Sequence, residues 1–189
     1  TLASSGIYQV VRQTDSKLLI SGLFDSYDGT VRNRLARINA DGSLDTSFVP
    51  PTTYTSGTIS GFALQTDGKV LIFGSFTGVG STPRNRIARL NSDGSFDASF
   101  DPGVGTGGTS PFISALVVQP DQKILICGTF TSFNGVSRNR IARLNADGTL
   151  DNSFDPGTGA GGVPLQLISI SLQSSGKVIV GGQIGRAHV

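Results

Sequence analysis

The feature that most constrains this chain is an internal repeat of about fifty residues. The four lysines are separated by 52, 54 and 54 residues, and glutamines and glycines recur at the same spacing: Lys17, Lys69, Lys123 and Lys177; Gln13, Gln65, Gln119 and Gln173; Gly22, Gly74, Gly128 and Gly182. The sequence RNRIARLN occurs from Arg84 and again from Arg138, and RNRLARIN begins at Arg32. The chain therefore contains three full units and the opening of a fourth.

Each unit divides into four short apolar runs that are separated by turns. In the third unit the runs are ISALVV, KILICGTF, NRIARLN and TLDNSF, and the two hairpin turns are QPDQ and NADG. The sequence NADG is typical of a type I turn that ends in a glycine with positive φ. Gln122 and Ser16 replace that glycine in two of the units, so we expect those two turns to be strained or differently shaped. All 13 acidic residues are aspartate, which favours turns over helices. The pattern predicts an all-β fold of four-stranded antiparallel blades, a β-propeller.

The turn length fixes the register of the outer hairpin in each unit. With a three-residue loop at 146–148, Asn145 pairs with Thr149 and Arg143 with Asp151. The same spacing predicts two further pairs, Arg37 with Asp45 and Arg89 with Asp97, and we interpret all three as structural ion pairs. The phenylalanines that recur at unit spacing are predicted to form the core between blades: Phe24, Phe76 and Phe130; Phe48, Phe100 and Phe154.

Two sequences carry a family resemblance: LQTDGKVLIFGSFT, followed by RNRIARLNSDGSFDASFDPG. Together they resemble the delta-60 repeat of bacterial β-propellers, and the resemblance covers about 6–183. It implies four-stranded antiparallel blades in large proteins that are secreted or held at the cell surface, and it implies no known enzymatic activity. The order of strands is also similar to that of NHL-type propellers. By that analogy the run at 113–118 lies innermost and 149–154 outermost.

The repeat sets the expected boundaries along the chain. Blades are expected at 5–55, 56–110 and 111–164, and the first hairpin of a fourth blade at 165–183. The last six residues, IGRAHV at 184–189, resemble a translated sequencing adapter and are interpreted as a non-native tail, so the single histidine, His188, is given no role. Propellers close with four to eight blades. We therefore interpret the chain as a fragment whose partners include further blades of a parent protein.

Composition and motifs argue against several classes of function. A formal net charge of +2 does not favour nucleic acid, and no apolar run approaches a membrane span. The glycine-rich sequences at 103–108 and 157–162 match G-x-G-x-x-G but join blades rather than a strand to a helix. Asp41, Asp93 and Asp147 are interpreted as turn formers, with calcium at the long loops as an open alternative. Cys127 occupies a strand position that the other units fill with Ser, Phe or Gly. We therefore interpret it as a residue that packs within a strand, and not as a nucleophile.

We therefore expect no catalytic, cofactor or metal residues and no cofactor. The expected function is a non-catalytic extracellular or cell-surface scaffold that mediates protein or glycan interaction or adhesion. The competing hypothesis is a fragment of a propeller hydrolase or lyase whose catalytic residues lie in other blades. Arg32, Arg84 and Arg138 open the third strands beside variable links, where recognition often resides. Either the three arginines form an arc that binds acidic glycans or carboxylates, or they cap strand ends and loop carbonyls.

Overall fold

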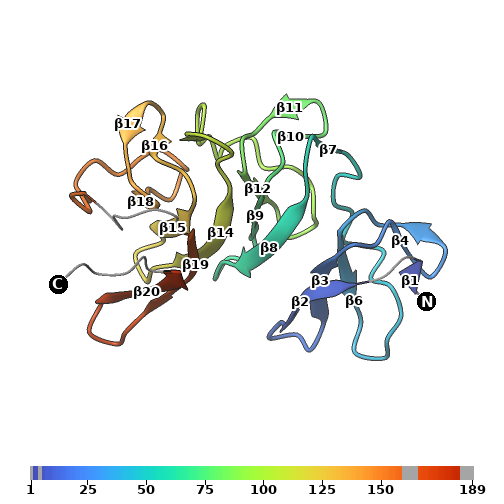
Figure 1. Cartoon of the computed structure of the whole chain (residues 1–189). Helices are drawn as coiled ribbons and strands as arrows, with labels where there is room; N and C mark the ends of the chain where they lie inside the picture. The colour runs from blue at the N-terminus through green and yellow to red at the C-terminus, as the bar shows by residue number, and fades with distance from the viewer. Residues whose placement is uncertain (1, 4–5, 159–165, 184–189) are drawn as a thin grey trace.

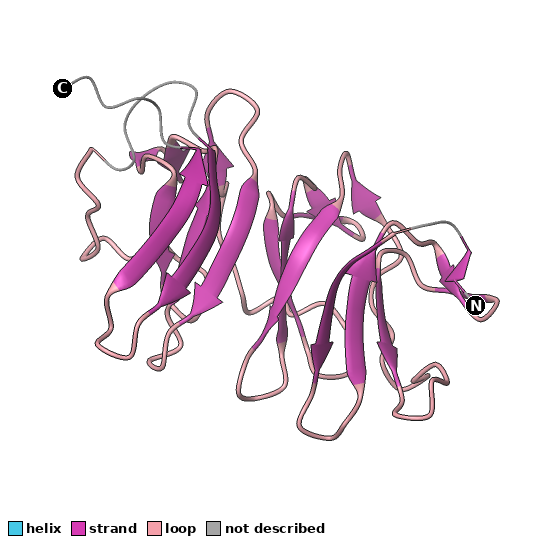
Figure 2. Ribbon diagram, turned by 60° about the horizontal axis from the view of Figure 1, so that its bottom comes forward, coloured by secondary structure: helices cyan, strands magenta, loops and turns pink. Residues whose placement is uncertain are grey.

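The computed structural model describes residues 2–3, 6–158 and 166–183, and every regular element in this part is a β-strand (Figures 1 and 2). The tail at 184–189, His188 and the second glycine-rich sequence beyond 158 lie outside the described residues. Within the described part, no helix is long and apolar enough to cross a lipid bilayer.

Three blades lie side by side, and each contains three antiparallel strands with the second strand in the centre (Figure 1). Blade 1 is β2 (Ile7–Arg12), β3 (Leu18–Gly22) and β6 (Leu35–Ile38). Blade 2 is β8 (Ile59–Leu64), β9 (Val70–Gly74) and β12 (Ile87–Leu90). Blade 3 is β14 (Ile113–Val118), β15 (Ile124–Gly128) and β18 (Ile141–Leu144). A fourth hairpin, β19 (Gln166–Leu172) and β20 (Val178–Gln183), follows at the C-terminal side.

The first strand of each unit lies at the inner edge of the blade. Strands β2, β8, β14 and β19 contact one another in that order, whereas the third strands do not join this row. Each inner strand has a β-bulge at the same position, between Ile113 and Ala115 in blade 3. The inner position expected for 113–118 is therefore the one observed.

The tight turns after the inner strands also agree with the sequence. Ser16 and Gln122 have φ of 70° and 65°, in the same left-handed region as Gly68 and Gly176 at 82° and 80°. The repeat thus imposes one turn geometry on all four hairpins, even where no glycine is present to adopt it without strain.

The fourth run of each unit forms a single β-bridge instead of a full strand. The bridges join Ile38 to Leu44, Leu90 to Phe96 and Leu144 to Leu150. The register is the predicted one, because Asn145 N donates to Thr149 O at 2.8 Å and Asp151 N donates to Arg143 O at 2.9 Å.

A local turn explains why this outermost strand ends so early. The Asp151 carboxylate accepts hydrogen bonds from the backbone N–H of Ser153 at 2.9 Å and from its hydroxyl at 2.6 Å. Aspartate that bonds two residues ahead offers the backbone an alternative to the sheet. The chain therefore leaves the blade after one pair.

The link between the second and third strands of each unit folds into a small hairpin. Each hairpin pairs with a two-residue strand from the segment before the blade, which makes a second, three-stranded sheet. The strands are β1 (Leu2–Ala3), β4 (Ser26–Tyr27) and β5 (Thr30–Val31); β7 (Tyr54–Thr55), β10 (Gly78–Val79) and β11 (Thr82–Pro83); β13 (Thr106–Gly107), β16 (Ser132–Phe133) and β17 (Val136–Ser137). The variable links are thus ordered by hydrogen bonds.

The hydrophobic core lies between blades, as the phenylalanine pattern predicts. Phe48 and Phe76 belong to one cluster formed by blades 1 and 2, and Phe100 and Phe130 belong to another formed by blades 2 and 3. Five of the six recurring phenylalanines are at most 2% exposed, and Phe154 is half-buried. Since burial of one such ring stabilises by roughly 1.5–3 kcal/mol, the blades depend on one another for their stability.

Candidate functional site

In each of the three complete units, an aspartate of the outer hairpin forms ion pairs with a lysine and an arginine and accepts hydrogen bonds from a serine. Asp97 Oδ2 lies 2.8 Å from Lys69 Nζ and 2.7 Å from Arg89 Nε, while its Oδ1 accepts from Ser99 N at 3.0 Å and Ser99 Oγ at 2.6 Å. Asp45 and Asp151 have equivalent partners: Lys17, Arg37 and Ser47; Lys123, Arg143 and Ser153. We call Asp45, Asp97 and Asp151 the central aspartates. The predicted arginine pairs are confirmed, and the lysine is an additional partner.

These carboxylates remain charged in the folded chain. Burial acts to raise the pKa of Asp97, but hydrogen bonds from Lys69, Ser99 and Arg89 outweigh burial and hold the pKa well below its ordinary value. The other two central aspartates shift in the same direction. A carboxylate with a low pKa and four hydrogen bonds is a structural anchor, and it has neither the proton affinity nor the access of a general base.

The arginine of each cluster also joins its blade to the next. Arg37 donates to the Ser92 carbonyl at 2.8 Å, and Arg89 donates to the Ala146 carbonyl at 2.7 Å. Backbone N–H groups make a parallel contact, from Val49 to Asp93 O and from Asp101 to Asp147 O, both at 2.8 Å. The charge cluster is therefore part of the connection between neighbouring blades.

The three arginines proposed as an anion-reading arc are turned inward. Arg32 and Arg138 are each 7% exposed, and the Arg84 side chain is 13% exposed. Each donates to the carbonyl of the residue before it, Val31, Pro83 or Ser137, at 2.8–2.9 Å. The structure therefore supports the alternative interpretation, in which these residues cap loop carbonyls at the start of the third strands.

Other candidates from the sequence take structural positions as well. Asp41, Asp93 and Asp147 each accept hydrogen bonds within their own turns, as expected of turn formers. The glycine-rich sequence at 103–108 contains β13 and precedes a strand. Cys127 is fully buried, and burial raises the pKa of its thiol to about 11. Among the described residues, no group of three His, Cys, Asp or Glu side chains is placed to hold a metal ion.

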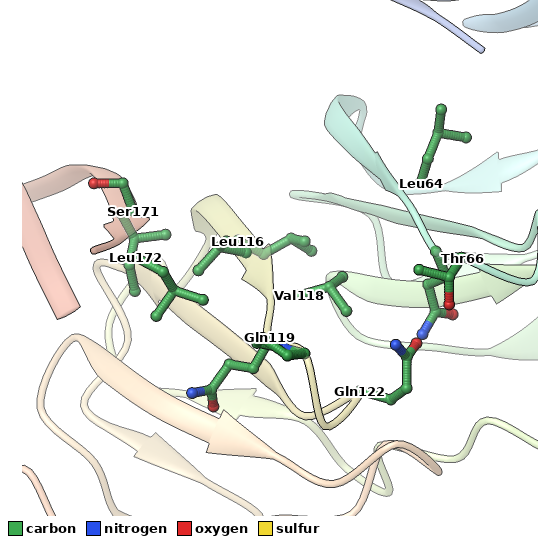
Figure 3. Close-up of a pocket in the computed structure, with 12 residues that line it drawn as sticks. Leu64, Thr66, Leu116, Val118, Gln119, Gln122, Ser171 and Leu172 are labelled. Carbon is green, nitrogen blue, oxygen red and sulfur yellow. The ribbon is translucent and has the colours of Figure 1, made fainter. Parts of the chain in front are cut away.

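The structure adds a site that the sequence did not reveal, a cleft where the inner strands of blades 2 and 3 and the fourth hairpin end (Figure 3). Its volume is about 670 Å³. The walls are apolar, with Leu64 on one side, Leu116 and Val118 in the centre, and Leu172 on the other side. Ile170 also lines the cleft. Among the residues that the structure describes, no charged side chain lines the cleft.

Amide side chains supply most of the polar groups at this cleft. Gln65, Gln119 and Gln122 line it together with Thr66 and Ser171. Gln65 is only 8% exposed, and the side-chain oxygens of Gln65 and Gln119 are buried without a hydrogen-bond partner. A buried polar group left unpaired costs about 1–3 kcal/mol. The cleft thus combines apolar walls with a few uncharged polar side chains.

Comparison with known families agrees with this architecture. The family model described as "Domain of unknown function (DUF5122) beta-propeller" matches three segments, 13–48, 65–100 and 119–154, which together cover more than half of the chain. The chain belongs to the DUF5122 β-propeller family. The resemblance to a propeller repeat noted in the sequence is therefore confirmed. A search of curated proteins found no significant match.

The matched segments include the outer part of each blade of the DUF5122 chain and leave out its inner strand. Each segment begins at a repeated glutamine and ends at a repeated phenylalanine, such as Gln65 and Phe100, so each contains a complete cluster around a central aspartate. The inner strands lie outside the segments, and with them Leu64, Leu116 and Val118 of the cleft. The charge clusters thus lie within the matched DUF5122 segments, whereas these cleft walls lie in strands outside them.

Proposed function

We propose that this DUF5122 chain is a non-catalytic β-propeller scaffold, extracellular or at a cell surface, that binds a protein or glycan partner through the inner cleft. The observation that carries the proposal is the combination of volume and chemistry at that cleft, about 670 Å³ of uncharged space across three successive units. Ligand sites are typically concave and mostly apolar, with a few polar groups that fix orientation. The extracellular setting follows from the resemblance to delta-60 proteins.

The chemistry of the lining favours a neutral ligand. An ionised group would lose its water without gaining an opposite charge, because the described residues of the lining offer only amide and hydroxyl side chains beside the apolar ones. A neutral group with hydroxyl or amide functions fits better, since the lining side chains Thr66, Gln122 and Ser171 can exchange hydrogen bonds with it. Uncharged sugars and the backbone of an extended peptide both have these properties.

The scaffold supports such a site because the cleft spans separate sheets. Blades 2 and 3 are held together by the bond from Arg89 to the Ala146 carbonyl and by the shared core around Phe100 and Phe130. A cleft whose walls are fixed in this way loses little conformational freedom on binding.

The proposal is tested by comparing ligand binding by the parent chain with binding by variants in which the cleft is obstructed. The chain is screened on an array of neutral and acidic glycans and against extracellular protein fractions, beside the variants Thr66→Arg and Ser171→Arg. Both residues are exposed at the cleft, so the added side chains should obstruct it without disturbing the core. Thr46→Arg is the matched control, because Thr46 is exposed on the outer side of blade 1.

The expected result is binding by the parent chain and by Thr46→Arg, with loss of binding in both cleft variants. Binding that survives both cleft substitutions would place the partner elsewhere and refute the role of the cleft. Turnover of a bound glycan by the parent chain would refute the non-catalytic assignment.

A further inference from the structure

The inner strand of each blade has an edge that no other described strand pairs with. Strand β14 stands at one end of its sheet, in the order β14-β15-β18, and β8 stands at the equivalent end of its own sheet. In an antiparallel pair, successive residues turn their N–H and C=O groups alternately toward the partner strand and away from it. Gln119 N donates to Lys123 O at 2.8 Å, so the alternation turns the backbone groups of Val117 toward β15. The backbone groups of Leu116 and Val118 therefore point to the open edge.

In blade 2, a side chain from blade 1 fills the equivalent part of this edge. Phe62 in β8 corresponds to Leu116 in β14. Each pairs with the third residue of the central strand, Ile72 and Ile126 respectively. The Gln9 carboxamide bonds to both backbone groups of Phe62: its Oε1 accepts from Phe62 N at 2.9 Å, and its Nε2 donates to Phe62 O at 3.0 Å. The edge of an inner strand in this fold therefore binds a primary carboxamide in a bidentate manner.

Blade 2 has no such side chain to place at Leu116. The residue of blade 2 that corresponds to Gln9 is Gly61. Each pairs with the fourth residue of the central strand, which is Ser21 in blade 1 and Phe73 in blade 2. A Cβ atom on Gly61 would lie 2.7 Å from Phe73 Cζ, so the phenyl ring occupies the space beside this glycine. A phenyl ring has no hydrogen-bonding group to take the place of the glutamine amide.

The open edge at Leu116 lies in the inner cleft. Leu116 and Val118 both line that cleft and occupy its centre (Figure 3). Their side chains are half-buried, and Leu64 and Leu172 extend the apolar wall on either side. A ligand that bonds to the Leu116 backbone must therefore also cover apolar side chains. A peptide with apolar residues on both sides of a carboxamide meets both requirements.

We infer, on the basis of the proposed function, that the partner of the inner cleft is a protein segment that places a glutamine or asparagine side chain on the Leu116 edge, as Gln9 is placed on Phe62. A primary carboxamide has an acceptor oxygen and a donor N–H on the same side, so one group reaches both backbone groups of a residue. The acetamido group of a sugar is a trans secondary amide, whose N–H and C=O point in opposite directions. A sugar hydroxyl has a single oxygen for both bonds. The Leu116 edge therefore favours a protein over a glycan.

Exchange of individual backbone N–H groups with D2O, followed by NMR on the full chain, tests the inference. The probe is a short peptide of alternating leucine and glutamine, acetylated at its N-terminus and closed by an N-methylamide at its C-terminus. In the matched control peptide, each glutamine side-chain nitrogen is dimethylated. The control is therefore also neutral and keeps the acceptor oxygen, but it has no N–H to donate to the Leu116 carbonyl.

The glutamine peptide should slow exchange of the Leu116 N–H by about tenfold or more, and the dimethylated peptide should not. Without peptide, the Leu116 N–H should exchange faster than the Phe62 N–H, because the latter is bonded to Gln9. Gln9→Ala should therefore speed exchange at Phe62 and leave exchange at Leu116 unchanged. Thr66→Arg, which obstructs the cleft, should abolish the protection by the peptide.

Slow exchange at Leu116 without peptide would overturn the inference, and so would unchanged exchange at Phe62 in Gln9→Ala. Failure of both peptides to protect Leu116 would overturn it as well. Equal protection by both peptides would do the same, because the partner would then pair through its own backbone. In each of these cases the proposed function would still stand if the parent chain bound another ligand that Thr66→Arg and Ser171→Arg exclude.

Discussion

Replacing Asp97 by alanine should be among the most destabilising single changes at a polar residue. The carboxylate is nearly fully buried and accepts four hydrogen bonds, from Lys69, Arg89 and both donors of Ser99. Lys69 is 29% exposed and can turn to solvent, so its pair contributes little. The Arg89 side chain is 10% exposed and would keep its charge without a carboxylate.

The expected loss of unfolding free energy in Asp97→Ala comes from the Arg89 guanidinium, which stays buried without a carboxylate partner. Removing one partner of a buried ion pair costs about 3–5 kcal/mol. Since Arg89 retains the Ala146 carbonyl, we expect about 3 kcal/mol, at the lower end of that range. For a chain of this size such a loss lowers Tm by roughly 6–12 °C. Asp151→Ala should cost less, because the Arg143 side chain is 22% exposed.

Urea denaturation of four variants checks this reasoning. Asp67→Ala is the control, since its carboxylate accepts one bond from Lys69 N in an exposed turn. Arg89→Met combined with Asp97→Ala should be less destabilised than the sum of the two single changes, because no buried charge is then unpaired. A cost for Asp97→Ala no larger than that for Asp67→Ala, or strict additivity in the double variant, would refute the role of the buried ion pair.

Gly94→Ala should destabilise more than Gly42→Ala: both glycines have φ of 88°, so the backbone strain is matched and only Gly94 packs against the preceding blade; equal urea midpoints would count against that packing. Because the central aspartates have lowered pKa values, their stabilisation is fully present above about pH 4, the pKa of unfolded aspartate, and is lost as pH falls below it. The urea midpoint should therefore decline below about pH 4 and much less in Asp97→Ala, and a decline already complete above about pH 5 would contradict the assignment. Cys127 should react with a thiol reagent only after unfolding, and rapid reaction of the native protein would show that the strand opens.

Much of the fold was predictable because the turn lengths and residue spacings recur in every unit, and they determine which residues pair across strands and which are buried. The hairpin pairing of Arg143 with Asp151 follows from a three-residue loop alone, and the burial of phenylalanines follows from their period. The bridge that replaces the fourth strand had a readable signal as well. The aspartate followed two residues later by serine, as in Asp151 and Ser153, is typical of a turn that competes with a sheet.

The candidate site was less predictable because it depends on how blades are placed in space. Lys69 lies 28 residues from Asp97, and only the pairing of three strands brings them together. The burial of Arg32 and Arg138 depends on their surroundings in the folded chain, which the residue pattern does not state. The cleft draws its walls from three units, and the distances between units are not encoded in any one of them.

The single-residue pairing at Leu44, Phe96 and Leu150 has a consequence for how such a repetitive chain remains dispersed. A long outermost strand would expose a row of free amide and carbonyl groups, and a chain with several similar units would multiply that row. In each of the three units that contain this bridge, the chain bends away from the sheet after the central aspartate. Adhesion between the rims of separate molecules is thereby discouraged without any change to the contacts that join one unit to the next.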